Sequence, residues 1–390
     1  MKTWEKNYKL NKKVEKYTVG SDYFLDQKLL KYDCKASIAH VKMLNKLNIL
    51  TKEECEKLQN ALENIIQLDK KNLFKINPED EDCHTAIENY LIKKLGDAGK
   101  KIHTARSRND QVLTALRLYS KDEMKQVIKK VENLIKSISI FKEKYGNIIL
   151  PGYTHMRKAM PSSITLWSDA FIESMHDNLD LMEIIYTYID KSPLGTGAGY
   201  GLPLEVDRKF TANLLGFEKI QNKSLYVQNS RGKFESLILE GLSQIMMDLN
   251  KISSDIILFS MSEFGFFEIS SEICTGSSIM PHKKNPDALE ILRANYHKIT
   301  SYQFQIKSVI GNLISGYNRD VQLTKEPIIN GFNLIKESLD VMMLIFEHLS
   351  VNTKKCEKAM TDELFATKKV YDLVEAGVPF REAYRKISKN

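Results

Sequence analysis

Apolar residues recur at steps of three and four between Arg231 and Phe267, and this stripe constrains the fold more than any other feature of the sequence. Its members are Phe234, Ile238, Leu242, Ile245, Leu249, Ile252, Ile256 and Phe259. Shorter stripes with the same spacing begin at Val127, Ile164 and Ile335. This spacing predicts long amphipathic helices, whereas the period-two alternation of strands is scarce. We therefore expect a mainly α fold.

Few residues interrupt these helices, since the 390-residue chain contains only 9 prolines and 18 glycines. Sparse turns argue against an all-β sandwich and against a glycine-rich nucleotide-binding fold. Long apolar stripes can be buried only if the helices pack side by side. The sequence therefore predicts an elongated helical subunit with a long central helix bundle, and further burial of the stripes against other subunits.

Three turn-rich segments suggest where the chain divides. They are residues 77–82, 151–155 and 315–320. We predict from them an N-terminal helical domain at residues 1–103, a central long-helix bundle domain at 104–325 and a short C-terminal helical domain at 326–390.

Charge and cysteine content limit the possible partners and the compartment. The 57 basic and 50 acidic residues give a net charge of +7, which is spread along the chain and does not indicate a nucleic-acid partner. The five cysteines are widely separated and form no C-x-x-C pair, so neither a disulfide framework nor a zinc ribbon fits. No apolar run approaches the ~20 residues that cross a bilayer. We expect a soluble cytoplasmic protein that makes no contact with a membrane.

The segment HTARSRNDQV, His103 to Val112, places two arginines in a chain that otherwise uses lysine. Guanidinium groups bind carboxylates through two parallel hydrogen bonds, so Arg108 and Asn109 are candidate ligand contacts. The alternative is an exposed helix start that is capped by Asn109 or Asp110, and for Asp110 we favour this capping role.

Two histidines are candidates for proton transfer. His155 follows Thr154 in a loop between two prolines, and His84 follows an acidic run at the start of an expected helix. A histidine can exchange a proton near neutral pH. The alternatives are a structural role for His155 and a helix-terminal position without chemistry for His84.

The segment TGSSIMPHKKNPD, Thr275 to Asp287, combines hydroxyl groups, lysines and prolines before a predicted helix. A loop that closes on itself can bring Ser277 near Lys283 and near the helix N-terminus. The positive charge of Lys283 and the positive end of the helix dipole both favour an alkoxide or a bound carboxylate. The alternative is an ordinary serine-containing turn.

These segments together resemble a known family. GSSIMPHKKNP is similar to the signature loop of the fumarase/aspartase superfamily. HTARSRNDQV, PGYTH at Pro151, EFGF at Glu263 and PFREAY at Pro379 resemble the argininosuccinate lyases within that superfamily. The similar segments follow the family order along essentially the whole chain.

The resemblance implies an activity and an assembly. Members of the family split argininosuccinate into arginine and fumarate without a metal or an organic cofactor, as a step of arginine biosynthesis. It also implies a mostly helical homotetramer in which three subunits contribute to each active site.

The resemblance further assigns roles to individual residues. Ser277 would remove the proton β to the departing nitrogen, and Lys283 would meet the charge that develops on the adjacent carboxylate. His155, oriented by Glu290, would lie on the side of the leaving group, where protonation of the guanidino nitrogen completes the elimination. The positions that match substrate-binding residues are His84, Arg108, Asn109, Thr154, Asn285, Tyr317, Gln322 and Lys325. Arg231 falls where the family carries an arginine near the site.

Some positions depart from the family pattern. His282 and Arg157 stand where glutamine is common, and Asp22 stands where a substrate-contacting serine is usual. The α-amino-acid end of the pocket is therefore expected to be built differently. The chain also ends soon after PFREAY, for which we expect altered stability or subunit contacts and retained activity.

Two alternatives follow from the same resemblance. An adenylosuccinate lyase-type enzyme would need phosphate-binding residues, and the SRND segment with Tyr317, Gln322 and Lys325 argues against it. A non-catalytic structural homologue, like the delta crystallins of the lens, would not need all of Ser277, Lys283, His155 and Glu290, which are present together.

Overall fold

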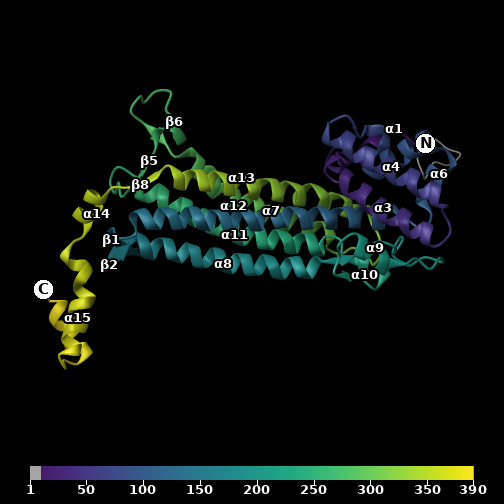
Figure 1. The fold of residues 1–390 in the computed structure, drawn as a ribbon. Coiled ribbons are helices and arrows are strands. Elements are labelled where there is room, and N and C mark those ends of the chain that lie inside the picture. Colours follow the sequence, from purple (N-terminus) through teal and green to yellow (C-terminus); the bar gives the residue numbers. More distant parts are fainter. Residues whose placement is uncertain (1–9, 390) are drawn as a thin grey trace. The chain divides into compact units, whose positions relative to one another are not determined.

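The structure, a computed structural model that describes residues 10–389, is mainly α-helical, as predicted (Figure 1). The helices are α1 (Lys12–Val19), α2 (Asp22–Leu25), α3 (Leu30–Lys46), α4 (Lys52–Lys70), α5 (Cys83–Leu95), α6 (Asp97–Lys100), α7 (Arg108–Tyr145), α8 (Ile164–Ile189), α9 (Arg208–Leu214), α10 (Ser224–Asn229), α11 (Lys233–Phe259), α12 (Asp287–Ile310), α13 (Lys325–Glu347), α14 (Thr353–Ala359), α15 (Ala366–Glu375) and α16 (Phe380–Ile387). Short 3-10 helices are η1 (Asp26–Lys28), η2 (Pro78–Asp80), η3 (Lys101–His103), η4 (Ser271–Ile273), η5 (Arg319–Thr324) and η6 (Asp362–Phe365).

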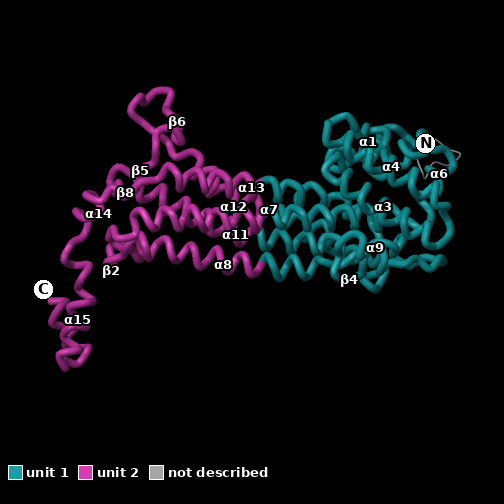
Figure 2. The backbone as a smooth tube through the Cα atoms, viewed as in Figure 1, with its two compact units in different colours: residues 1–126, 182–242, 300–333 teal, residues 127–181, 243–299, 334–390 magenta. Residues whose placement is uncertain are grey.

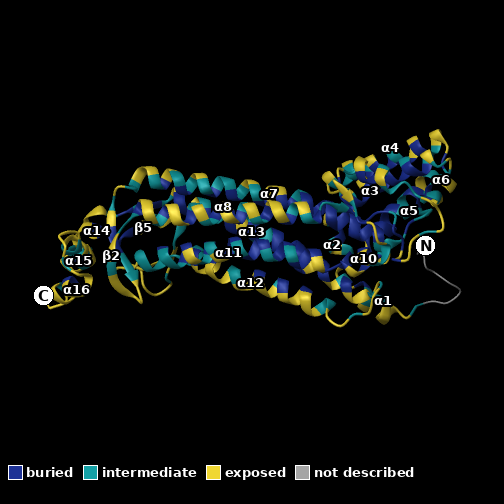
Figure 3. Ribbon diagram, turned by 90° about the horizontal axis from the view of Figure 1, so that it is seen from below, coloured by how far each residue is buried: buried dark blue, intermediate teal, exposed yellow. Residues whose placement is uncertain are grey.

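The longest predicted stripe forms α11, and every member of it except Phe259 is buried. Buried and exposed residues lie along the same long helices in Figure 3, as an amphipathic helix requires. The helix ends at Phe259, the last member of the predicted stripe. Gly265 adopts a positive φ of 57° and its N–H donates to the carbonyl of Met261, so the chain turns there. Phe267 then starts a strand.

The strands are short and pair in twos. They are β1 (Ile149–Thr154), β2 (Arg157–Ser163), β3 (Lys191–Ser192), β4 (Lys219–Ile220), β5 (Phe267–Ile269), β6 (Thr275–Gly276), β7 (Lys284–Asn285) and β8 (Leu349–Val351). β1 pairs antiparallel with β2, β5 with β8 and β6 with β7, whereas β3 and β4 are parallel. Two of the polar loops singled out in the sequence are therefore the tips of hairpins, β1–β2 and β6–β7.

The chain forms two compact units, shown in Figure 2. Unit 1 contains residues 1–126, 182–242 and 300–333, and unit 2 contains residues 127–181, 243–299 and 334–390. The long helices α7, α8, α11, α12 and α13 each contribute residues to both units. The three sequence-based domain ranges remain a prediction.

Among the described residues, no helix is both long enough and apolar enough to span a membrane.

Candidate active site

Unit 1 contains a polar pocket of about 190 Å³ that gathers six of the predicted substrate-binding residues. They are His84, Arg108, Asn109, Tyr317, Gln322 and Lys325. These residues come from α5, α7, the segment around η5 and the start of α13, which are far apart in the sequence. The pocket also presents Asp22, Glu81 and Asp82, so its wall carries charges of both signs.

His84 lies in the first turn of α5, whose N-terminus is capped by the side chain of Asp82. Its Nδ1 donates to Oδ2 of Asp33 at 2.9 Å, and both side chains are buried. Burial alone would lower the pKa of His84, but the carboxylates of Asp33, Asp82 and Asp26 raise it above the ordinary value. Nε2 of His84 is buried and has no hydrogen-bond partner among the described residues. In its protonated form, His84 can therefore donate one more hydrogen bond to a ligand.

The His84–Asp33 pair predicts a pH dependence of stability. Burial by itself would raise the pKa of Asp33, but His84 lowers it. The pair contributes fully to the stability of the fold between pH 3.8 and pH 6.5, which are the ordinary pKa values of aspartate and histidine. Its contribution is lost as the pH rises through the raised pKa of folded His84, or falls through the lowered pKa of folded Asp33. We expect the midpoint of urea denaturation to drop with rising pH less steeply in His84→Gln than in the unmodified protein. Identical pH profiles would contradict this.

Lys325 begins α13 and is buried between two carboxylates. Its Nζ donates to Oδ2 of Asp22 and to Oδ1 of Asp26, both at 2.7 Å. Burial would lower the pKa of Lys325, but Asp26 and Asp22 raise it above the ordinary value, so the ammonium stays charged.

Removal of this ammonium should destabilise the protein strongly. Lys325→Met leaves Asp22 and Asp26 buried without their counter-charge, and we expect a loss of about 3 to 5 kcal/mol in the free energy of unfolding. Urea denaturation measures the loss. The matched control adds Asp22→Asn and Asp26→Asn to Lys325→Met, which should recover much of the stability. A single variant as stable as the unmodified protein would contradict the assignment.

Arg108 opens α7 beside the same pocket. Its guanidinium lies 3.3 Å from carboxylate oxygens of Glu81 and Asp82 and donates to Oγ1 of Thr85 at 2.6 Å. Arg108 therefore lies where it could contact a ligand in the pocket, and the carboxylates of Glu81 and Asp82 already orient its side chain.

Asp110 has the predicted capping role in a modified form. Oγ of Ser107 accepts from the N–H of Asn109, while Oδ1 of Asp110 accepts from the N–H of Ser107. Oδ2 of Asp110 also accepts hydrogen bonds from the N–H groups of Gly195 and Gly197. These bonds hold the segment that contains the two glycines against the start of α7.

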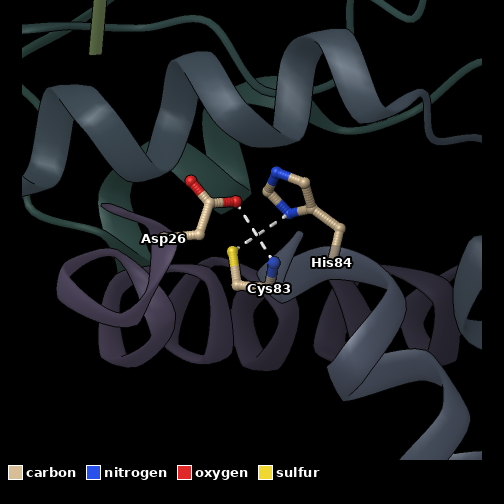
Figure 4. Close-up of side chains that lie close together, drawn as sticks. All are labelled: Asp26, Cys83 and His84. Atoms are coloured by element: carbon tan, nitrogen blue, oxygen red, sulfur yellow. Dashed lines mark hydrogen bonds between the residues drawn. The ribbon is translucent and has the colours of Figure 1, made fainter. Parts of the chain in front are cut away.

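One cluster beside the pocket has the composition of a metal site. Ligand atoms of Asp26, Cys83 and His84 lie within 4.8 Å of one another (Figure 4). Each is already engaged: Asp26 accepts from Lys325 and from the N–H of Cys83, and His84 faces Asp33. Burial also raises the pKa of the Cys83 thiol well above its ordinary value, which opposes the thiolate that a metal needs. We assign the cluster to the hydrogen-bond network of the pocket.

Thr154 and His155 lie in unit 2, at the tip of the β1–β2 hairpin. Thr154 pairs with Arg157, so His155 and Met156 form a two-residue turn, and both have positive φ values of 52° and 59°. Such turns normally use asparagine or glycine, because other side chains are strained there. A strained, exposed histidine is typical of a functional position rather than a structural one.

Ser277, Lys283 and Asn285 lie on the β6–β7 hairpin of unit 2, and Glu290 lies in the first turn of α12. Oγ of Ser277 accepts from the backbone N–H groups of Met280 at 3.2 Å and Ile279 at 3.4 Å. Lys283 and Glu290 are exposed. Among the described residues, no hydrogen bond joins Ser277 to Lys283 or His155 to Glu290. In the isolated subunit, Lys283 of the hairpin and Glu290 of α12 therefore face solvent.

The sequence interpretation missed several residues of the pocket network. Asp26, Asp33 and Asp82 are buried and support Lys325, His84 and Arg108. One signal was present: Asp22, Asp26 and Asp33 follow one another at steps of four and seven, the spacing of one helix face.

Comparison with known proteins identifies the family. A family model described as "Lyase" matches residues 8–300. The chain is 53% identical to an argininosuccinate lyase of Thermotoga neapolitana over 100% of this chain and 98% of that protein. It is 39% identical to an argininosuccinate lyase of Phocaeicola vulgatus over 99% of this chain and 86% of that protein.

A solved structure shows the same fold at lower identity. The crystal structure of EDDS lyase in complex with formate is similar with a TM-score of 0.81 and 23% identity, over 98% of this chain and 76% of that one. The chain therefore shares its fold with that structure, and the sequence relatives show the family. The chain belongs to the argininosuccinate lyase family.

Proposed function

We propose that the protein cleaves argininosuccinate to arginine and fumarate, as a step of arginine biosynthesis in the cytoplasm. The observation that carries this proposal is the pocket of unit 1, whose wall presents carboxylates beside arginine, lysine and histidine side chains. Argininosuccinate carries carboxylates, an ammonium and a guanidinium, and so needs partners of both signs. Of the predicted residues, His84, Arg108, Asn109, Tyr317, Gln322 and Lys325 would bind it here.

Ser277 would start the reaction. Its oxygen takes the proton from the carbon β to the departing nitrogen, and the resulting carbanion delocalises onto the adjacent carboxylate. A serine is an ordinarily weak acid, so its alkoxide must be stabilised. The two backbone N–H groups that point at Oγ of Ser277 favour the negative charge, and Lys283 adds a cation on the same loop. Lys283 and Asn285 would also meet the charge that develops on the carboxylate.

His155 would lie beside the leaving group and supply the proton that it takes up. The C–N bond breaks as the double bond of fumarate forms, and the guanidino nitrogen takes a proton from the imidazole side, directly or through water. Glu290 would orient His155, and Thr154 would bind the substrate beside it. Thr154 and His155 lie exposed at the end of the β1–β2 hairpin, where a substrate can reach both side chains.

We further propose a homotetramer with active sites built from three subunits. The unit 1 pocket has no described lining residue among Ser277, His155, Lys283 and Glu290, so proton transfer there needs groups from outside the pocket. Long helices also expose large apolar side chains: Leu166, Ile291 and Phe304 are 62%, 62% and 72% exposed. Contact with other subunits would bury them.

Incubation of the purified protein with argininosuccinate tests the proposed activity. We expect fumarate, followed by its absorbance, and arginine, quantified separately, to appear in equal amounts. Adenylosuccinate serves as the control substrate and should give no fumarate above background. Cleavage of adenylosuccinate alone, or no cleavage of either compound by a folded oligomer, would contradict the proposal.

A further inference from the structure

A second pocket lies in unit 1, apart from the candidate active site. It has a volume of about 420 Å³ and shares no lining residue with the polar pocket that contains His84 and Lys325. Its walls are formed by residues of α3, residues of α7 and the turn at the end of α9. A pocket of this size can hold a small organic molecule.

One of the four lysines that line the second pocket has a structural role. Nζ of Lys121 donates to Oδ1 of Asp190 and, at 2.6 Å, to the carbonyl oxygen of Gly216. The side chain of Lys121 is only 7% exposed. These contacts hold the turn after α9 against α7 and neutralise the ammonium, so Lys121 shapes the pocket and leaves the ligand to the other lysines.

The other three lysines carry charge that the protein does not balance. They are Lys35 and Lys42 on α3 and Lys125 on α7. Among residues 10–389, no ion pair joins any of the three to a carboxylate. The lining includes one carboxylate, that of Asp122, which the three ammonium groups outnumber. The second pocket therefore favours an anionic ligand.

Tyr32 adds a hydrogen-bond donor to the same wall. The residue is 2% exposed, and its ring is held by an edge-to-face contact with Tyr119 at 5.8 Å between ring centroids. Its Oη is buried and has no hydrogen-bond partner among the described residues. Burial and the charge of Asp122 raise the pKa of Tyr32, so the hydroxyl keeps its proton. An acceptor on a ligand would recover the free energy that this unpaired hydroxyl costs.

The remaining wall of the second pocket is apolar. Ile38, Leu118 and Leu215 line it, together with Leu214, which is 44% exposed. Covering such side chains with an apolar group is favourable, because it removes their surface from water. A ligand that carries only charge would leave this part of the pocket unused.

We propose that the second pocket binds a small phosphate monoester with an apolar ring. Lys35, Lys42 and Lys125 bind the phosphate, Tyr32 donates to one of its oxygens, and the leucines contact the ring. A phosphate fits better than a carboxylate, because lysines act as point charges with rotatable donors, and no arginine fork lines this pocket. The inference does not depend on the proposed function, since no residue assigned to cleavage lines this pocket.

Three probes test the two parts of this ligand separately. 1-Naphthyl phosphate carries both the ring and the phosphate, inorganic phosphate lacks the ring, and 1-naphthol lacks the charge. At pH 8 the phosphate monoester carries close to two negative charges, because its second pKa is about 6. We expect isothermal titration of the assembled protein to show tighter binding of 1-naphthyl phosphate than of either other probe.

Two substitutions should weaken the binding of 1-naphthyl phosphate. Tyr32→Phe should weaken it roughly tenfold through the loss of one hydrogen bond to a charged group. The same variant should keep its midpoint of urea denaturation, because the hydroxyl has no partner in the free protein. The double variant Lys42→Gln and Lys125→Gln should weaken binding roughly ten- to hundredfold.

A third substitution should act in the opposite direction, which a misfolded protein could not imitate. Asp122→Asn removes the carboxylate that repels the phosphate, and it should tighten binding roughly threefold or more. Lys93→Gln is the matched control: Lys93 is an exposed lysine of α5 that does not line the second pocket. This control should bind all three probes as the unmodified protein does.

Four results would overturn the inference. They are no binding of 1-naphthyl phosphate at millimolar concentrations, equal binding of 1-naphthyl phosphate and inorganic phosphate, unchanged binding in both Tyr32→Phe and the double lysine variant, and weaker binding in Asp122→Asn. Cleavage of argininosuccinate should be unchanged in Lys42→Gln with Lys125→Gln when no probe is present, because these lysines lie outside the substrate pocket. Loss of cleavage in that variant would show that the two pockets are not separate sites.

Discussion

Ser277→Ala should reduce the turnover of argininosuccinate by about a thousandfold or more, while subunit assembly and substrate binding stay intact. General-base catalysis contributes on the order of 10² to 10⁴ in rate, and here the same oxygen also starts the reaction. Alanine removes only this oxygen from an accessible hairpin, so the fold should not change. Fumarate absorbance measures turnover, and isothermal titration of argininosuccinate measures binding.

The neighbouring Ser278 provides the matched control for this substitution. Ser278 is exposed on the same hairpin, and its side chain makes no described hydrogen bond. Ser278→Ala should therefore keep most of the activity. If Ser277→Ala retained substantial activity while Ser278→Ala lost it, the base would be misassigned.

Mixing two inactive variants should restore activity if the sites are shared between subunits. His155→Ala and Ser277→Ala each remove one group from a different hairpin, β1–β2 and β6–β7. After dissociation and reassembly, some sites receive both intact groups from different subunits. Random mixing predicts recovery of roughly a quarter of the sites, since each group is intact in half of the subunits.

A second mixture controls for recovery by other means. Ser277→Ala and Lys283→Ala alter the same β6–β7 hairpin, so no single copy of the hairpin is intact in any mixed oligomer. This pair should stay inactive. Failure of the His155 and Ser277 pair to recover, despite subunit exchange demonstrated by mass-tagged subunits, would contradict sites shared between subunits.

The helices could be predicted well from the sequence because their burial is a local pattern. The stripe from Phe234 to Ile256 is buried along α11, as its spacing requires. The course of the chain beyond that helix could not be predicted as well. It depends on the turn at Gly265 and on the pairing of β5 with β8, a strand that lies after α12 and α13 in the sequence.

The site could be predicted in part. His84, Arg108, Asn109, Tyr317, Gln322 and Lys325 stand out as polar groups in motifs, and the structure brings them into one pocket. The aspartates behind them were not found, because a buried carboxylate is recognisable only by the distant cation that it pairs with. Asp26 and Lys325, for example, are far apart in the sequence yet 2.7 Å apart in space. The roles of Ser277, His155, Lys283 and Glu290 remain a prediction.

A crystal structure of the assembled Ser277→Ala protein with argininosuccinate bound would test the central claim most directly. The claim is that the β6–β7 hairpin delivers the oxygen of Ser277 to the carbon that loses its proton. We predict that Cβ of the substituted residue lies in van der Waals contact with that carbon, with the hairpin closed over a substrate bound in the unit 1 pocket. Density for the bound substrate with this residue well out of contact, although the hairpin is closed, would contradict the account.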